Sequence, residues 1–171
     1  MSIQIFLSCP TSINATQTKV RKLICGECER LGFIIRSLGF TDYPTKFPLG
    51  EVLKLAKPCS GGLILGFAQF QTSQGIWKSG TPYEQQQQSI TAFPTAWNQL
   101  EAGILFAIGV PLLIFREENI TGGIFDSGVS DLFIQRMPKL NRSRIDRNAF
   151  RQVIDKWASE VKAHYDRNNF I

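Results

Sequence analysis

Three apolar runs that lack polar alternation restrict the folds open to this chain more than any other feature. They occupy residues 3–7, 61–67 and 110–115, and each has the length of a strand rather than of a helix. Strands that are buried on both faces have this composition, because helices cover both sides of a parallel sheet. Segments with helical spacing of apolar residues separate the runs. We therefore predict an α/β fold with a parallel sheet between two layers of helices.

The predicted elements alternate in the order of a flavodoxin-like doubly wound sheet of about five strands. The strands are expected at 3–8, 33–38, 61–67, 110–115 and 132–135, and the helices at 15–31, 52–59, 95–109 and 146–166. Neither an internal repeat nor a second set of elements follows. We expect one domain over residues 1–171, which is long enough for a complete core.

A long polar connection, residues 68–93, separates the third predicted strand from the next helix. It contains four consecutive glutamines at 85–88 and the aromatic residues Phe70, Trp77 and Tyr83. Loops of this length in a compact domain usually serve a function. We expect this segment to be a mobile lid or a surface for self-association.

Charge and composition exclude several classes of protein. Of the 171 residues 19% are charged, with a net charge of +5, as in an ordinary globular domain. The basic residues cluster at 139–151. We interpret this cluster as a solvated loop followed by the start of a helix rather than as a surface that binds nucleic acid. No apolar stretch approaches the roughly 18–20 residues that span a bilayer. We expect a cytoplasmic protein without a targeting segment and without nucleic-acid or membrane partners.

Neither the cysteines nor the glycines form a cofactor motif. Cys25 and Cys28 have the spacing of a zinc or redox pair, but they fall within a predicted helix, and the only histidine is His164. No Gly-x-Gly-x-x-Gly follows the first strand, which argues against a dinucleotide-dependent oxidoreductase. We expect reduced thiols, no metal site and no cofactor.

Glu101 is the most unusual ionisable residue of the chain. It is the only charged residue between Glu84 and Arg116, within a helical segment that is otherwise apolar or small. A carboxylate there is costly to desolvate unless it lines a cleft. Two interpretations remain open at this point: a cleft carboxylate, or a glutamate at the solvated edge of its helix.

Ligands of doubly wound sheets bind at the carboxyl ends of the strands, where the strand order reverses. The loop after the first strand supplies Ser8, Pro10 and Thr11 as candidates to contact a substrate, and Asp42 lies on the next loop. Amides and hydroxyls of the first loop suit a phosphate or sugar at the start of a helix, although Ser8, Thr11 and Ser12 could instead cap that helix.

The motif Thr95-x-Trp97-x-x-x-Glu101 resembles the Ser-x-Trp-x-x-x-Glu pattern of TIR domains, in which the glutamate is catalytic. Residues 5–8 and 48–50 resemble the first strand and the proline–glycine loop of that family. Asn98 stands where many TIR domains have cysteine, and we regard it as a further candidate to contact substrate. Trp97 lies on the same side of the helix as Glu101, where it either stacks on a ligand or packs in the core.

Residues 101–103 and 107–111 also resemble nucleoside 2-deoxyribosyltransferase-like proteins, which use a helix glutamate and a Gly-x-Pro turn. Both resemblances imply chemistry at a ribosyl anomeric carbon, with Glu101 as the catalytic carboxylate and NAD or a related nucleotide as substrate. The alternatives are a nucleotide-sensing or self-associating adaptor of the same fold, or a deoxyribosyltransferase. The resemblance further implies a homo-oligomer and, as in many bacterial relatives of this type, a role in antiviral defence.

Overall fold

The centre of the protein is a five-stranded, all-parallel sheet. The computed structural model describes residues 2–43, 45, 47–129 and 134–169. The strands of the sheet have the order β2-β1-β3-β8-β9, which reads 2-1-3-4-5 when only these strands are counted. Their bounds are β1 (Gln4–Ser8), β2 (Ile34–Arg36), β3 (Gly61–Gly66), β8 (Leu112–Arg116) and β9 (Ile134–Arg136). This order confirms the predicted flavodoxin-like, doubly wound fold.

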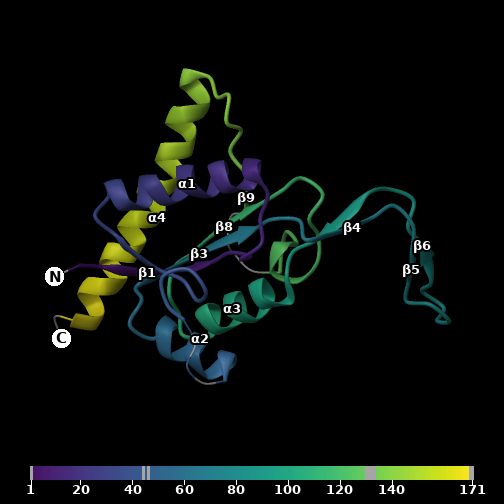
Figure 1. Cartoon of the computed structure of the whole chain (residues 1–171), viewed down its shortest axis with the longest axis horizontal. Coiled ribbons are helices and arrows are strands. Elements are labelled where there is room, and N and C mark those ends of the chain that lie inside the picture. Colours follow the sequence, from purple (N-terminus) through teal and green to yellow (C-terminus); the bar gives the residue numbers. More distant parts are fainter. Residues whose placement is uncertain (1, 44, 46, 130–133, 170–171) are drawn as a thin grey trace.

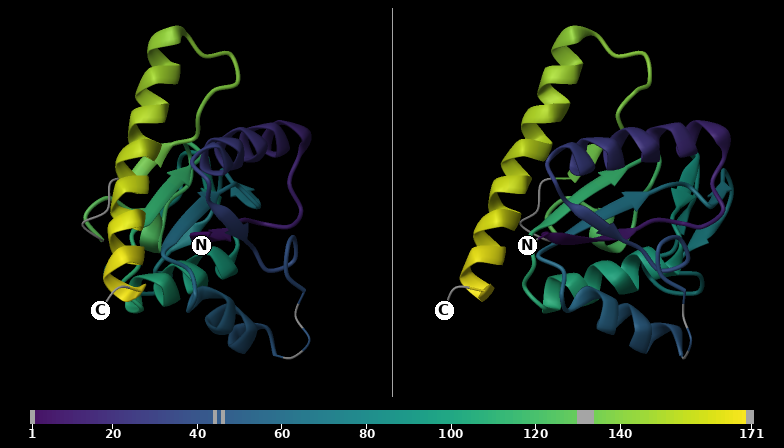
Figure 2. Two further views of the ribbon diagram at one scale, coloured as in Figure 1. Left: turned by 90° about the vertical axis from the view of Figure 1, so that its left-hand side faces the viewer. Right: turned by 60° about the vertical axis from the view of Figure 1, so that its left-hand side comes forward.

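Helices cover both faces of the sheet (Figure 1, Figure 2). One face packs against α1 (Ala15–Arg30) and α4 (Arg144–Asn169), and the other against α2 (Pro48–Ala56) and α3 (Ala96–Ala107). Each face has its own apolar cluster, because alternate residues of a strand point to opposite sides. Ile5 and Leu63 belong to the α1/α4 side, and Phe6 and Ile64 to the α2/α3 side.

The central strand β3 explains how closely the layers approach. All six of its residues are buried. A Cβ atom at Gly61 would lie 2.6 Å from Cγ2 of Val161 on α4, and one at Gly62 would lie 3.0 Å from Cδ1 of Leu105 on α3. Side chains at these two positions would push the neighbouring side chains away, so glycine is required for the observed packing.

Most of the predicted element boundaries agree with the structure to within a few residues. Helix α2 begins at Pro48 rather than after residue 50, because proline is well suited to the first turn of a helix. The predicted strand residues Leu132 and Phe133 lie outside the described part of the chain. On α4, Val153 is only partly buried, at the edge of the apolar cluster on its face of the sheet. No helix within the described ranges is long and apolar enough to cross a membrane.

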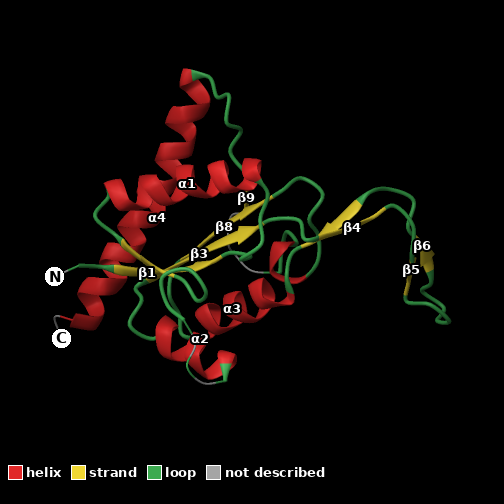
Figure 3. Ribbon diagram, in the orientation of Figure 1, coloured by secondary structure: helices red, strands yellow, loops and turns green. Residues whose placement is uncertain are grey.

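The prediction of a loop at 68–93 is wrong, because this segment contains four short strands. Strands β4 (Phe70–Thr72) and β7 (Thr91–Phe93) pair antiparallel, as do β5 (Ile76–Trp77) and β6 (Gln85–Gln86). They form a ribbon, here called the arm (residues 69–93), which projects from the body (Figure 1, Figure 3). Most residues of the arm are exposed on both of its sides. Its strands therefore show no alternation of apolar and polar residues that would reveal them.

Candidate functional site

A cavity of about 270 Å³ lies at the carboxyl edge of the sheet, on the α2/α3 side. Its walls come from the loop after β1, the segment after β2, the start of α2 and the first turns of α3. The lining residues are Cys9, Pro10, Thr11, Leu38, Pro48, Thr95, Trp97 and Glu101. The cavity thus forms where the chain leaves β1 toward one face and β3 toward the other, which is the switch point of a doubly wound sheet.

Glu101 is the acidic residue of this cavity. It lies in the second turn of α3 and is only 8% exposed. Burial raises the pKa of its carboxyl group from 4.5 to about 7, and the Ser8 hydroxyl acts in the opposite direction. The structure therefore places Glu101 in a cleft rather than at the solvated edge of its helix. Near neutral pH both the acid and the carboxylate are populated.

Ser8 and Asn98 lie beneath Glu101 and do not line the cavity. Both are buried, at 0% and 1% exposure. The side-chain amide of Asn98 donates a hydrogen bond of 2.8 Å to the Ser8 hydroxyl, which joins the end of β1 to α3. Thr95, the N-cap of α3, binds both the backbone and the side chain of Asn98. These two predicted site residues are placed to position Glu101 rather than to touch a ligand in the cavity.

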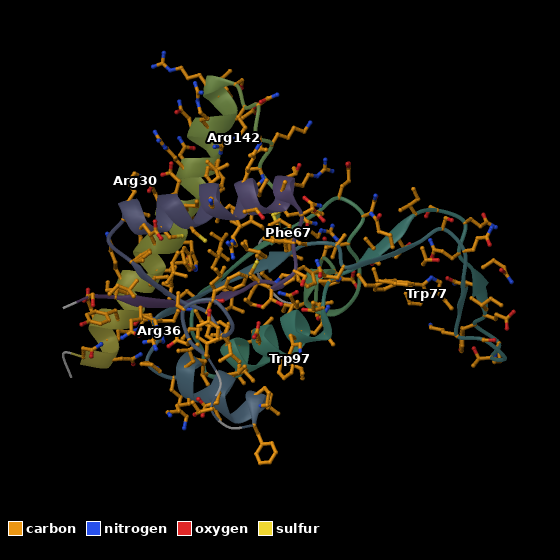
Figure 4. All side chains as sticks on the ribbon, viewed as in Figure 1. Arg30, Arg36, Phe67, Trp77, Trp97 and Arg142 are labelled. Carbon is orange, nitrogen blue, oxygen red and sulfur yellow. The ribbon has the colours of Figure 1, made fainter. Side chains whose placement is uncertain are left out.

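Trp97 is a wall of the cavity and not a core residue. Its side chain is 43% exposed on the first turn of α3 (Figure 4). The interpretation of Trp97 as a buried aromatic that orients the helix is therefore wrong. An exposed indole beside a cavity offers a flat apolar surface on which a ring can stack.

Pro10 and Thr11 line the cavity, whereas Asp42 does not. Arg36 donates a hydrogen bond of 2.9 Å from Nε to the Asp42 carboxylate, and this contact lowers the pKa of Asp42. Asp42 is therefore engaged in an ion pair with Arg36. The sequence of this loop does not indicate that pairing. Asn14, not Thr11 or Ser12, caps α1, because its side chain accepts from the backbone of Gln17.

Sequence reasoning missed four of the lining residues: Cys9, Leu38, Pro48 and Thr95. Each lies close to the end of a strand or the start of a helix. The predicted ends of these elements were therefore the only sequence feature that could have identified them as lining residues. Cys9 is not a nucleophile here, because burial raises the pKa of its thiol to about 12 and the thiolate is the reactive form.

Burial also raises the pKa of the other three thiols, that of Cys59 to about 12. Cys25 and Cys28 lie along α1, and burial raises their pKa values to about 11 and about 12. No group of three or more His, Cys, Asp or Glu side chains in the described ranges could hold a metal ion.

Comparison of the chain with protein-family models and with curated proteins finds no match.

Proposed function

We propose that this protein cleaves the bond between ribose and base in NAD or a related nucleotide, with Glu101 as the catalytic carboxylate. One observation carries the proposal: a buried glutamate with a pKa of about 7 on the wall of a cavity at the switch point of the sheet. Perturbed acids in such cavities are typical of catalytic sites.

The chemistry requires a fixed negative charge beside the anomeric carbon. When the bond from C1′ to the base nitrogen breaks, the base keeps the electron pair and the sugar becomes oxocarbenium-like. Ionised Glu101 stabilises that charge and then accepts a proton from the water whose oxygen bonds to C1′. Nicotinamide leaves NAD as a neutral ring, so its departure needs no general acid. One carboxylate is sufficient for this reaction.

The shape of the cavity suits the nucleoside end of such a ligand. Its volume of about 270 Å³ is slightly below the range that encloses a drug-sized molecule, so the phosphates of a nucleotide would extend outside it. The base would stack on Trp97. The phosphates would extend past Thr11 toward the start of α1, where the helix dipole favours an anion.

The test is chromatography of base release from a panel of nucleotides and nucleosides, with the wild type, Glu101→Gln and an exposed control, Glu160→Gln. We expect wild-type turnover, an unaffected control, and a loss on the order of 10²-fold or more in Glu101→Gln. Full activity of Glu101→Gln would refute the assignment. Binding without turnover would instead support the nucleotide-sensing adaptor, and base release only with an acceptor base would support the deoxyribosyltransferase.

We further propose that the protein forms a homo-oligomer through the outer side of α3. The exposed residues there carry no charge: Ala96, Leu100, Gly103, Phe106 and Ala107. Solvent-facing sides of helices are normally polar, and contiguous apolar surface marks an interaction site. Each copy of the chain has a net charge of +5, so the electrostatic repulsion between two copies is smallest when they meet through an uncharged face. In a twofold dimer both copies contribute the same face.

Light scattering of the purified protein tests this assembly. Leu100→Glu places a charge at the middle of the face, at 48% exposure in the single chain, so it leaves the core intact. We expect an oligomer for the wild type and a monomer for the variant, with Lys54→Glu on α2 as the control. A monomeric wild type would refute the proposal.

A further inference from the structure

A second cavity, of about 330 Å³, lies on the opposite side of the sheet from Glu101. It forms between the end of β9, the segment 138–142 and the first turns of α4, and it shares no lining residue with the Glu101 cavity. Three cationic side chains and one carboxylate line it: Arg136, Lys139, Arg142 and Asp146. A cavity with this excess of positive charge is suited to an anion.

Arg142 is the unusual residue of this cavity. Its Nε and Nη1 atoms are buried and have no hydrogen-bond partner among the described residues. The guanidinium carbon lies 4.6 Å from the centroid of the Phe150 ring, which holds the group against the cavity wall. A buried charge without a partner is costly, and an arginine cannot relieve that cost by losing its proton.

The acidic groups near Arg142 are already engaged by other partners. Glu27 accepts hydrogen bonds from Arg30 at 2.6 Å and from Arg151 at 3.1 Å. Asp146 accepts from the hydroxyl of Ser143 at 2.7 Å, at the start of α4. Neither carboxylate is hydrogen-bonded to Arg142, so the positive charge of its guanidinium at the cavity wall is left for an incoming anion.

The remaining walls are apolar. Phe115 of β8 and Phe150 of α4 lie with their ring centroids 5.9 Å apart, and Val153 lines the cavity beside them. Both rings are buried, at 2% and 9% exposure, so Pro138, Ala149 and Val153 provide the apolar surface that faces the cavity. A bare inorganic ion would leave that surface in water. An anion with an attached apolar group would bury it, at a gain of roughly 25 cal/mol per Å².

We propose that this cavity binds a phosphate monoester that carries an aromatic or other apolar group. The phosphate oxygens accept from the side of the Arg142 guanidinium that faces the cavity. Lys139 and Arg136 balance the second negative charge, which distinguishes a phosphate dianion from a carboxylate. The apolar group lies against Pro138, Ala149 and Val153. This site is independent of the reaction proposed at Glu101.

Calorimetric titration with phenyl phosphate, inorganic phosphate and benzoate tests both parts of the site. We expect phenyl phosphate to bind most tightly, because only it supplies the dianion and the ring together. Arg142→Met keeps an apolar side chain over Phe150 and removes the charge, so phenyl phosphate affinity falls at least about tenfold. The control is Arg167→Met, at the far end of α4, where the net charge changes equally.

Several outcomes would overturn the proposal. They are no binding of phenyl phosphate at millimolar concentrations, equal binding by the wild type and Arg142→Met, and an equal loss in the Arg167→Met control. Inorganic phosphate that binds as tightly as phenyl phosphate would show a simple surface attraction to anions. Should Arg142→Met fail to fold, Lys139→Met replaces it, because Lys139 is exposed; unchanged phenyl phosphate affinity in that variant would refute the site.

Discussion

The Glu101 cavity and the Arg142 cavity each contain a partly or fully buried ionisable group, and the two groups have opposite charges. On the α2/α3 side Glu101 is an isolated carboxyl group whose pKa burial raises to about 7. On the α1/α4 side Arg142 is an isolated guanidinium whose pKa burial lowers. Desolvation disfavours the charged form in both, yet only the carboxyl group can become neutral in the physiological range.

That difference separates the roles the two residues can have. A carboxyl group that gains and loses a proton near neutral pH can act as an acid, a base or a stabilising charge within one reaction. Arginine keeps its charge under all these conditions. The Glu101 cavity is therefore suited to proton-coupled chemistry, and the Arg142 cavity to binding of an anion without chemistry.

The largest expected effect on stability is at Glu101. Because the pKa of its carboxyl group is raised to about 7 from 4.5, the folded state holds the proton more tightly than the unfolded state. The resulting stabilisation is complete below pH 4.5 and is lost as the pH rises through 7, by about 3 kcal/mol. Glu101→Gln should lack this loss and unfold at higher denaturant concentration than the wild type at pH 8.

Urea titrations of wild type, Glu101→Gln and the exposed control Glu160→Gln at pH 5 and pH 8 measure the effect. If the wild type and Glu101→Gln respond identically to pH, Glu101 is not the buried titrating group, and the contrast between the cavities fails.

A smaller effect with a different pH dependence is expected at Arg142. Arg142→Met removes two enclosed N–H donors that lack an acceptor, and without ligand it should raise the free energy of unfolding by about 1–2 kcal/mol. The gain should be the same at pH 5 and pH 8, because arginine does not titrate there. A destabilised Arg142→Met in the same urea titrations would mean that the guanidinium has a partner within the protein.

The contact beneath Glu101 is expected to contribute less still. Ser8→Ala removes the hydroxyl that lowers the pKa of Glu101 and leaves the side-chain amide of Asn98 without its acceptor. We expect a loss of about 1 kcal/mol of stability and a further rise in the pKa of Glu101, measured by carboxyl carbon NMR across pH. An unchanged titration midpoint would show that Ser8 does not act on this carboxyl group.

The smallest effect is expected from the arm. Deletion of residues 73–87 leaves the pairing of β4 with β7 and joins these strands through residues 88–90. No arm residue lines either of the two cavities, so stability should change by less than about 1 kcal/mol. The Glu101 titration and phenyl phosphate binding should be unchanged. An altered titration would revive the prediction of a lid, and a smaller oligomer would indicate self-association through the arm.

The sequence revealed most about residues whose environment is decided by their neighbours along the chain. The uninterrupted runs at 61–67 and 110–115 predicted the parallel sheet, because strands covered on both faces need apolar residues at every position. The isolation of Glu101 in an apolar helix marked it as a costly charge. The arm stayed hidden because exposed strands carry no apolar periodicity.

What the sequence by itself determined is the doubly wound fold and the position of Glu101 at its carboxyl edge. Only the tertiary structure decided that Asp42 binds Arg36, that Asn98 supports Ser8 from 90 residues away, and that Arg142 lies against Phe150. The physical reason is the range of the interactions. Secondary structure follows from periodicity over a few residues, whereas the partner of a polar side chain depends on which distant segments the packed layers bring together.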